Sequence, residues 1–406
     1  MRTTKSMSFK INRPHLTEIR DKNKVAILGM LRSGVAISRP EIAESLNLSL
    51  MSVSRLVKEL VNEGICRSEG ERSSNRMLGR RPSFVSLNTD YGWVVAVCLS
   101  AFSKGISIID IAGNKRFEAS IPEDKSKTPD VAARFIGKTV KSFLTRHQST
   151  AGKLLGCAVV VAGQFDIKSG VLLSAPLLNW SGINIQKLIE DELPCEVAVD
   201  NIANALCLSH VDNIQIRTAK TPNIMLVHVA AGMGASLFIN NQLVRRGGDE
   251  GWIGHLKIQS SKCKPDEKLS LSEVVSGRAL IANLAKHKNF EIDEGADFAS
   301  NFKRAIDETN SGNKGFSEMF EDAGKTFGES LFVLSASSQP DFLVLAGPAF
   351  NTTPFEESVR KGFEQASVDA NQRWTSIQVS RHSYLDAAES MALRKYFCRA
   401  QNSQTL

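Results

Sequence analysis

From Gly92 onward the chain follows one pattern, and this pattern limits the possible folds more than any other feature. Short apolar runs such as WVVAVCLS, ISIIDIAG, LLGCAVVVAG, CEVAVD, IMLVHVAAG and DFLVLAG mostly end at Gly or Asp. Helical stretches such as PDVAARFIGKTVKSFLTRH separate several of these runs. Strands that alternate with helices predict an α/β sheet. Glycine at the strand ends would let the backbone approach a ligand closely.

The 406 residues suffice for two or three domains, and their charge is unevenly distributed. Residues 1–90 contain 16 Lys and Arg against 9 Asp and Glu, whereas the rest of the chain contains 34 of each kind. The net charge of +7 therefore lies entirely in the first fifth of the chain. A basic module joined to a neutral body indicates a protein that binds nucleic acid.

The spacing of apolar residues in this basic region predicts two short helices joined by a tight turn. Ser38 and Glu41 fit a capping box at the start of the first helix, with Pro40 in its first turn. Ser49 is a favourable N-cap for the second, which ends at Gly64. Such a pair is a helix-turn-helix motif whose second helix reads DNA. The residues that we expect to contact DNA from this motif are Arg39, Ser49, Ser52, Ser54, Arg55 and Lys58.

A β-hairpin is predicted to follow the second helix. The segment ICRSEGERSSNRMLGRRPSFVSLN alternates like a strand, breaks into a polar loop and resumes as SFVSL. Arg80 and Arg81 lie on its short arm, where guanidinium groups suit the negative potential of a narrow minor groove. Helices and hairpin together predict a winged helix-turn-helix domain, with double-stranded DNA as its partner.

Cysteine content and hydropathy restrict the compartment. The seven cysteines are scattered, with no CxxC or CxC pair, which is typical of reduced thiols in a cytoplasmic protein. No apolar run reaches the roughly 20 residues of a membrane span, and MRTTKSMSFKINRPH lacks the apolar core of a signal peptide. We therefore expect a cytoplasmic protein with no membrane partner.

Three segments of the body, behind a winged helix-turn-helix that ends in GRRP, resemble the ROK family (repressors, open reading frames and sugar kinases). They are VVVAGQFDIKSGVLLSAPLLNW (159–180), DNIANALCLSH (200–210) and AAGMGASLFINNQLVRRGGDEGWIGHLKI (230–258). The resemblance covers nearly the whole chain and implies an α/β actin-like (ribonuclease H-like) two-lobed sugar-kinase fold. We expect the DNA-binding domain at 1–90, lobes at 91–210 and 211–383, and a C-terminal helix at 384–406 that packs back on the body.

The chain departs from the kinases of this family at the residues that would do chemistry. The family's general base is an aspartate, and Ile202 stands at its position, where an aliphatic side chain cannot accept a proton. The phosphate loop Asp-x-Gly-Gly-Thr is replaced by CLSAFSKG (98–105), and Gly-Thr-Gly-x-Gly by AAGMG (230–234). Phosphoryl transfer needs base, metal and phosphate loops together, so we expect no enzyme activity and no cofactor.

Part of the family's sugar site is implied to remain. Trp252 replaces its glutamate, although the indole could simply plug the cleft, and His255 matches its histidine, although it could be a structural histidine. Another sugar-contacting glutamate aligns with Ser272, and the adjacent Glu273 could substitute for it. The residues implied to contact an effector are Asn179, Asn201, Trp252 and His255.

The family's structural zinc site is implied to be lost. Of its four ligands only His255 and Cys263 remain, with Pro265 and Ser270 at the other two positions. Structural zinc needs four good ligands, so we expect no metal.

These observations predict a sequence-specific DNA-binding transcriptional regulator, a repressor of carbohydrate-related genes. Its catalytically inactive body would sense a sugar or sugar-phosphate effector, or mediate oligomerisation. Because helix-turn-helix proteins usually occupy two half-sites, we expect a homodimer or homotetramer. Two alternatives remain, namely a DNA-binding protein whose body only oligomerises or docks a protein partner, and a bifunctional sugar kinase.

Overall fold

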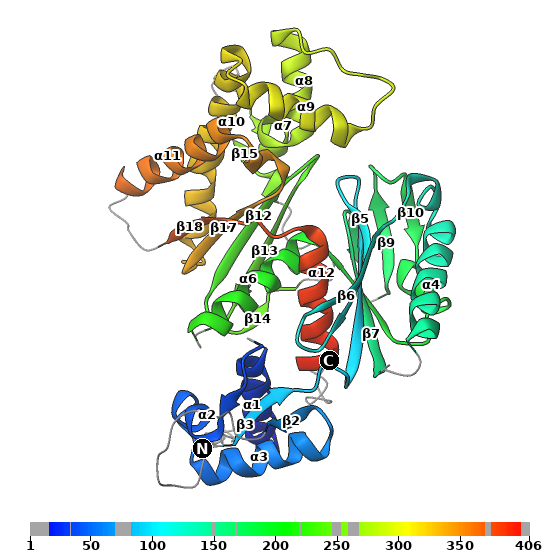
Figure 1. Ribbon diagram of the computed structural model, residues 1–406. Coiled ribbons are helices and arrows are strands. Elements are labelled where there is room, and N and C mark those ends of the chain that lie inside the picture. The colour runs from blue at the N-terminus through cyan, green and yellow to red at the C-terminus, as the bar shows by residue number, and fades with distance from the viewer. Residues whose placement is uncertain are drawn as a thin grey trace, which may run out of the picture.

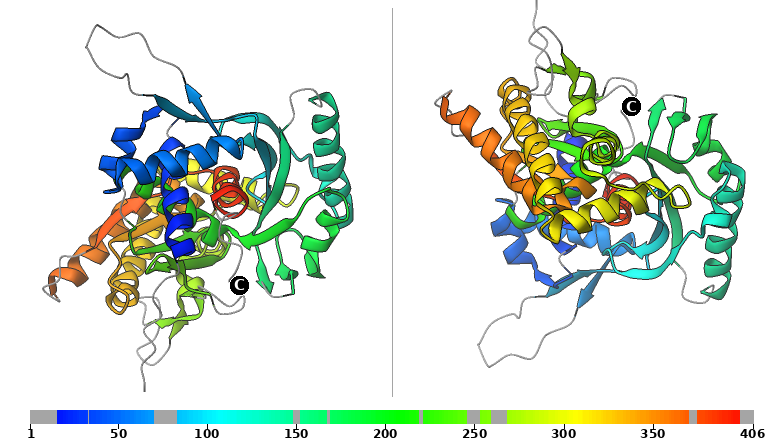
Figure 2. Two further views of the ribbon diagram at one scale, coloured as in Figure 1. Left: turned by 90° about the horizontal axis from the view of Figure 1, so that it is seen from below. Right: turned by 90° about the horizontal axis from the view of Figure 1, so that it is seen from above.

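The structure is a computed structural model, and it describes residues 16–32, 34–69, 83–147, 152–166, 169–218, 221–245, 253–258, 268–369 and 375–398. The chain forms a small N-terminal domain and a larger body of two lobes (Figure 1). Seen from below, the N-terminal domain lies in front of part of the body (Figure 2). The N-terminal domain is thus placed at one end of the body.

The N-terminal domain combines short helices with a small antiparallel sheet. Its elements are α1 (Leu16–Leu31), β1 (Ile37–Ser38), α2 (Arg39–Ser45), α3 (Leu50–Asn62), β2 (Cys66–Glu69) and β3 (Phe84–Leu87). The predicted capping box of Ser38 and Glu41 is present, and Ser49 caps α3 as predicted. Between the two helices, Asn47 adopts a φ of 50°, a left-handed conformation that Asn tolerates.

The first and last strands of the predicted wing pair as a β-hairpin. Strands β2 and β3 pair antiparallel, with Cys66 opposite Leu87 and Glu69 opposite Phe84. Strand β1 adds to the outer side of β3, which gives the order β1-β3-β2. Residues 70–82, including Arg80 and Arg81, lie outside the described residues. A winged helix-turn-helix domain is therefore confirmed, whereas the placement of its two arginines stays a prediction.

The first lobe is a mixed sheet with helices on its faces. The strands β11, β7, β4, β5 and β6 lie in that order, and the pairs β4–β7 and β7–β11 are parallel. The elements of this lobe are β4 (Gly92–Leu99), β5 (Lys104–Asp110), β6 (Lys115–Ser120), η1 (Glu123–Lys125), α4 (Pro129–Arg146), β7 (Lys153–Val161), β8 (Gln164–Asp166), β9 (Val171–Ala175), β10 (Trp180–Ile183), α5 (Ile185–Glu190) and β11 (Val197–Asn201).

The second lobe repeats the same sheet topology. Its strands lie in the order β14, β13, β12, β17, β18, again a hairpin at one side and parallel pairs at the other. Its elements are α6 (Ile202–Thr218), β12 (Ile224–Val229), β13 (Met233–Ile239), β14 (Gln242–Leu243), η2 (Ile253–His255), β15 (Lys257–Ile258), β16 (Leu269–Ser270), α7 (Leu271–Val275), α8 (Gly277–Lys288), α9 (Phe298–Asn310), α10 (Lys314–Ala336), β17 (Phe342–Ala346), η3 (Pro348–Asn351), α11 (Thr353–Asp369) and β18 (Ser376–Val379).

The central strand β4 shows why the apolar runs are continuous. Trp93, Val95, Val97 and Leu99 point into the core shared with α4, while Val94, Ala96 and Cys98 point into the core shared with α6 and the C-terminal helix. A strand that is buried on both faces needs apolar residues at every position. The predicted α/β, two-lobed fold is confirmed.

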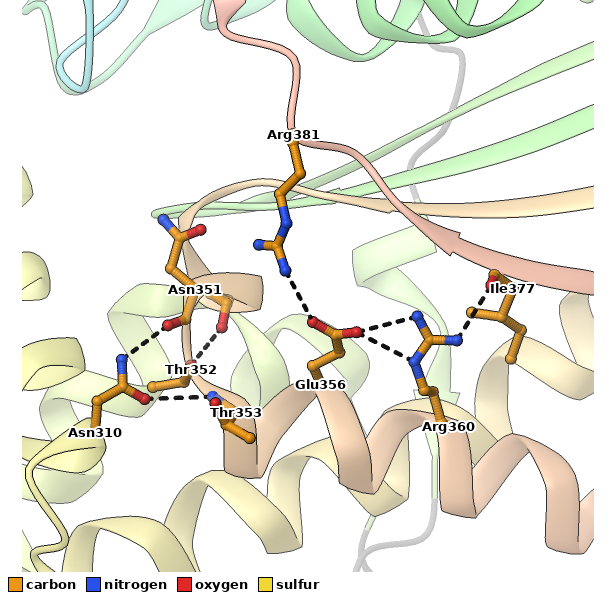
Figure 3. Close-up of polar contacts among 9 residues, drawn as sticks. Asn310, Asn351, Thr352, Thr353, Glu356, Arg360, Ile377 and Arg381 are labelled. Atoms are coloured by element: carbon orange, nitrogen blue, oxygen red, sulfur yellow. Dashed lines mark hydrogen bonds and ion pairs between the residues drawn. The ribbon is translucent and has the colours of Figure 1, made fainter. Parts of the chain in front are cut away.

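The chain passes from the first lobe to the second through α6 and returns through residues 380–383. The predicted lobe boundary between residues 210 and 211 falls inside α6, so the division of the chain into four parts stays a prediction. The returning segment is fixed to the second lobe, because Arg381 Nη2 lies 3.4 Å from Glu356 Oε2, and Arg360 also holds Glu356 (Figure 3). His382 Nδ1 lies 2.5 Å from Ser209 Oγ on α6.

The chain then forms α12 (Tyr384–Leu393) and a π-helical turn, η4 (Arg394–Cys398). Helix α12 packs against α6, β4 and β7 between the lobes, and its far end points toward the N-terminal domain (Figure 1). The turn η4 contacts both β7 and α1. Gly156 of β7 leaves room for the Tyr396 ring, which a Cβ at this position would strike.

Two smaller expectations can be compared with the structure. The described cysteines, Cys66, Cys98, Cys157, Cys195 and Cys207, are free thiols, as predicted. Burial raises the pKa of the Cys66, Cys98 and Cys207 thiols to about 12, so they stay protonated and unreactive. Among the described residues, no helix is long and apolar enough to cross a membrane.

Candidate DNA interface and interlobe cleft

Helix α3 presents one polar and one apolar face. Its buried face consists of Val53, Leu56, Val57 and Leu60, which pack into the domain core. Of the predicted DNA contacts, Arg55 exposes 71% of its side chain, Lys58 is exposed and Ser54 is half-buried. The opposite face of α3 is therefore open to a partner.

The other predicted DNA contacts surround the turn before α3. The Ser49 and Ser52 hydroxyls lie 2.8 Å apart, and the Ser52 amide donates to Ser49 Oγ at 3.1 Å. Arg39 is the first residue of α2 and is half-buried. Ser49 and Ser52 are exposed, so the turn and the start of α3 form one surface.

Ion pairs fix α3 to α1. Arg20 Nη2 lies 2.7 Å from Glu59 Oε2, and Lys24 Nζ lies 3.3 Å from the same atom and 2.7 Å from Glu63 Oε1. The hydrogen bond from Arg20 is the main cause that lowers the pKa of Glu59. Lys24 is buried, so its charge needs these carboxylates. Any displacement of α1 would therefore move α3 as well.

A cleft of about 480 Å³ lies between the lobes. Its polar lining comes from both of them, and Arg278 is the only Lys or Arg on its described lining, which also includes His228 and His255. No Asp or Glu lines it among the described residues, so these walls offer no carboxylate for Mg²⁺. Side chains on its lining include Ser100, Phe102, Gln164, Asn201 and Ile202 on one side and His228, Met233, His255, Ser272 and Arg278 on the other.

A hydrogen-bond network joins the lobes at the base of the cleft. Buried Asp200 accepts hydrogen bonds from the amide of Asn201 and from Asn204 Nδ2, both at 2.8 Å, and forms an ion pair with Arg245. Asn204 Oδ1 in turn accepts from Ser236 Oγ of β13 at 2.8 Å. Asn201 Oδ1 accepts from the Asn204 amide, so Asn201 caps α6. The Asn201 Nδ2 group has no protein partner among the described residues and can donate to a ligand.

Ile202 is the first residue of α6, lines the cleft and is only 3% exposed. An aliphatic side chain occupies the position next to Asn201 where the resemblance places a general base. Its neighbours in the core cluster are apolar, including Ala203 and Leu206. The cleft therefore keeps a donor amide but presents no proton acceptor at this position.

His228 connects the cleft to the C-terminal helix. Its Nε2 lies 2.7 Å from Tyr384 Oη at the start of α12. Burial lowers the pKa of His228 to about 4, so the ring is neutral at physiological pH. A neutral ring that bonds a phenol cannot act as a cationic phosphate ligand. It instead fixes the N-terminal end of α12 to the cleft wall.

The two segments that replace the phosphate loops are occupied by protein contacts. Phe102, in the turn between β4 and β5, packs edge-on against Phe298 and Phe302 of α9, with centroid distances of 6.1 and 6.4 Å. On the other loop, the carbonyls of Ala230 and Ala231 accept from the first amides of α8 at 2.7 and 3.1 Å. The first of the segments that the resemblance aligns with the phosphate loops thus packs in an apolar cluster, and the second is hydrogen-bonded to the start of α8.

The predicted effector residues separate into three groups. Asn201 and His255 line the cleft. Asn179 has a φ of 55° and lies exposed at the turn between β9 and β10, and it is not among the described residues that line the cleft. Trp252 lies outside the described residues. Of the two alternatives at the next position, Ser272 lines the cleft, whereas Glu273 accepts from the Ser270 amide and hydroxyl, both at 2.6 Å.

The metal expectation cannot be fully compared with the structure, because Cys263 and Pro265 lie outside the described residues. Among the residues that are described, no group of three or more His, Cys, Asp or Glu could hold a metal ion. The absence of zinc stays a prediction.

The lining residues that the sequence analysis did not single out include Phe102, His228 and Arg278. Phe102 lies in the segment that replaces a phosphate loop, so its position could have been found from the resemblance. His228 is inside an apolar run, IMLVHVAAG, where a histidine gives no signal of its own. Arg278 is brought to the cleft by the packing of α8 on the turn at Ala230–Ala231, which only the tertiary structure reveals.

Comparisons with known proteins agree with this geometry. Residues 105–391 match the ROK family and residues 20–65 match winged helix-turn-helix DNA-binding domains. The xylose repressor of Caldicellulosiruptor bescii is 29% identical over 277 residues, which cover 66% of this chain and 67% of that repressor. A crystal structure of a ROK family transcriptional regulator, a homolog of the E. coli Mlc protein, superposes with a TM-score of 0.70 at 15% identity, over 94% of this chain and 98% of that one.

The body alone also superposes on an enzyme. A ROK family glucokinase from Streptomyces griseus, in complex with glucose and AMPPNP, gives a TM-score of 0.56 at 17% identity over 75% of this chain and 100% of that one. Fold and site thus define a winged helix-turn-helix domain on a sugar-kinase-like body. The chain belongs to the ROK family, as a DNA-binding transcriptional regulator, because the family match covers most of its length.

Proposed function

We propose that the protein is a repressor of carbohydrate-related genes whose body binds a sugar-like ligand and transfers no phosphoryl group. The observation that carries this proposal is the cleft itself, which has polar donors but the aliphatic Ile202 at the position of the base. The name of the xylose repressor supports the choice of a sugar as the ligand class. The lining also suits a ligand that needs hydrogen bonds more than charges.

The donors in the cleft favour a polyhydroxylated ligand. Asn201 Nδ2 and the hydroxyls of Ser100 and Ser272 can bond sugar hydroxyls, and Arg278 can reach an anionic substituent. The polar groups lie on both lobes, so a ligand that bonds both sides would favour the closed arrangement. Ligand binding would then change the angle between the lobes and, through α12 and α1, the position of the DNA-reading helices. Two half-sites require a dimer or tetramer, which the body would form.

The test is selection of operator DNA from a pool of genomic fragments with the full-length protein. Selection is repeated with single sugars and with their phosphates. We expect a palindromic site whose recovery changes with one compound. A defined site that ignores every compound would contradict the sensing role and favour a body that only oligomerises or docks a protein.

The kinase alternative is tested separately with a coupled assay of ATP hydrolysis and a panel of hexoses. We expect no turnover from the wild-type protein, and none from Ile202→Asp, because the segment 98–105 lacks the aspartate and the glycine pair of the first phosphate loop, and its Phe102 packs against α9. Measurable sugar-dependent turnover by either protein would overturn the inactive assignment.

A further inference from the structure

The start of α3 carries an apolar side chain that the predicted DNA contacts leave unexplained. Met51, the second residue of α3, is 82% exposed, the highest value among the exposed large apolar side chains of the described residues. Leu50 before it is 52% exposed. Single exposed apolar residues are ordinary on protein surfaces, so exposure alone assigns no role.

Its position on the helix gives Met51 a role. Met51, Ser54, Arg55 and Lys58 are spaced i, i+3, i+4 and i+7, which places them on one face of α3. That face is opposite the buried Val53, Leu56 and Val57. Met51 therefore extends, at the N-terminal end, the stripe that contains the cations expected to contact DNA. In helix-turn-helix proteins it is the N-terminal part of the second helix that meets base edges.

The neighbouring polar groups do not cover Met51. The Ser49 and Ser52 hydroxyls bond each other at 2.8 Å across the cap, on the flank of the stripe. Arg55 lies one turn further along the helix, where its Nε is 3.9 Å from Glu59 Oε1 on the side toward α1. The side chain of Met51 thus projects from a capped, fixed helix end with polar groups around it.

We propose that Met51 reads a thymine in the major groove, by apolar contact between its side chain and the C5-methyl group. Among the four bases only thymine presents a methyl group in that groove, and apolar side chains are its usual partners. The unbranched thioether adapts to a surface that a β-branched residue would not fit. Attraction between the DNA phosphates and the basic residues of the domain, including Lys58, would bring the helix into the groove.

The test uses the operator recovered by selection, with each thymine of a half-site replaced in turn by deoxyuridine. This change removes the methyl group and keeps base pairing. Binding of full-length protein is measured by fluorescence anisotropy at one salt concentration. For the wild type we expect one position at which the replacement weakens binding about fourfold, the factor that corresponds to burial of a methyl-sized group.

Met51→Ala should weaken binding to the thymine operator by a similar factor and show no further loss with deoxyuridine at that position. Alanine is a strong helix former, and circular dichroism will show that α3 is retained. Met51→Leu should keep the thymine preference. Val333→Ala is the matched control, since it trims a side chain that is 67% exposed on α10 of the body.

Each remaining outcome is decisive. A Met51→Ala protein that still distinguishes thymine from deoxyuridine at every position, or a wild type that never does, overturns the inference and leaves DNA binding intact. A selection that returns no defined sequence overturns both this inference and the proposed function.

Discussion

The side chain of His228 at the cleft is uncharged in the folded protein, and the free energy of unfolding should therefore depend on pH. Burial lowers the pKa of His228 to about 4 from the ordinary value of 6.5. Between these values the unfolded chain binds a proton that the folded chain does not bind, so the free energy of unfolding falls as the pH falls. One pKa unit corresponds to about 1.4 kcal/mol, so this histidine costs roughly 3 kcal/mol at pH 4.

We therefore expect His228→Gln, which can still bond Tyr384, to be less sensitive to acid than the wild type. Thermal melting between pH 7 and pH 4 measures the difference. His210 is the control, because burial and the stacked His382 lower its pKa to about 4 as well. His210→Gln should remove a similar share of the acid sensitivity. Equal pH slopes for wild type and His228→Gln would show that folding does not lower the pKa of His228.

For single residues, the sequence could indicate which residue types matter but not which residues surround them. Ile202 stands out because an aliphatic side chain cannot accept a proton at the position of the general base. Asn201 stands out because Asn is a favourable N-cap. The ion pair of Asp200 with Arg245 joins residues far apart in the chain, so no local pattern indicates it. Asn179 was assigned to the effector site by resemblance alone; it lies at an exposed turn, and its role stays a prediction.

Among the elements, α10 and α11 pack closely because glycines at their contact carry no side chain. A Cβ added at Gly328 would strike the Val359 carbonyl oxygen and lie 2.7 Å from the Phe363 amide nitrogen, both backbone atoms of α11. Gly→Ala inside a helix normally stabilises by up to about 1 kcal/mol. Overpacking against backbone costs about 1–3 kcal/mol, so the sign should reverse here.

We expect Gly328→Ala to lower the free energy of unfolding by about 1–2 kcal/mol in denaturant titration. Gly315→Ala on the same helix meets only the flexible end of Lys288, at 3.1 Å, and should be neutral or stabilising. If both variants gain stability, the two helices are not in the close contact described.

Elements were the most predictable level of this structure. The DNA-binding helices follow from caps and apolar spacing, and the strands from continuous apolar runs. The repeated order of the two sheets was not predictable, because strand order depends on long-range pairing and the two lobes share no visible sequence repeat. The short β15–β16 pair has two residues in each strand, too few for an alternating pattern to show.

In the whole molecule, the C-terminal segment is placed to connect the cleft with the DNA-binding domain. Tyr384 bonds the cleft residue His228, Arg394 is paired with Asp212 of α6, and η4 contacts α1. The ion pairs between α1 and α3 continue this path to α3, the helix predicted to contact DNA. In the proposed mechanism, a change in the angle between the lobes would reach DNA along this path.

Gly156→Ala should weaken this connection without touching the cleft lining, because the added Cβ would strike the Tyr396 ring and displace η4 from β7. With the operator and the active compound from selection, operator affinity is measured with and without that compound. We expect the ratio of the two affinities to move toward one, while binding of the compound itself persists. Because coupling between sites is reciprocal, the effect of DNA on the affinity for the compound should shrink equally.

The matched control is Tyr396→Phe. The Tyr396 hydroxyl is buried and finds no hydrogen-bond partner among the described residues, so its removal should leave both stability and coupling at least as high as in the wild type. A loss of coupling in Gly156→Ala but not in Tyr396→Phe would place the transmission at the packing of the ring on β7. An unchanged affinity ratio in Gly156→Ala, with circular dichroism showing a folded protein, would mean that the lobes act on the DNA-binding domain by another route.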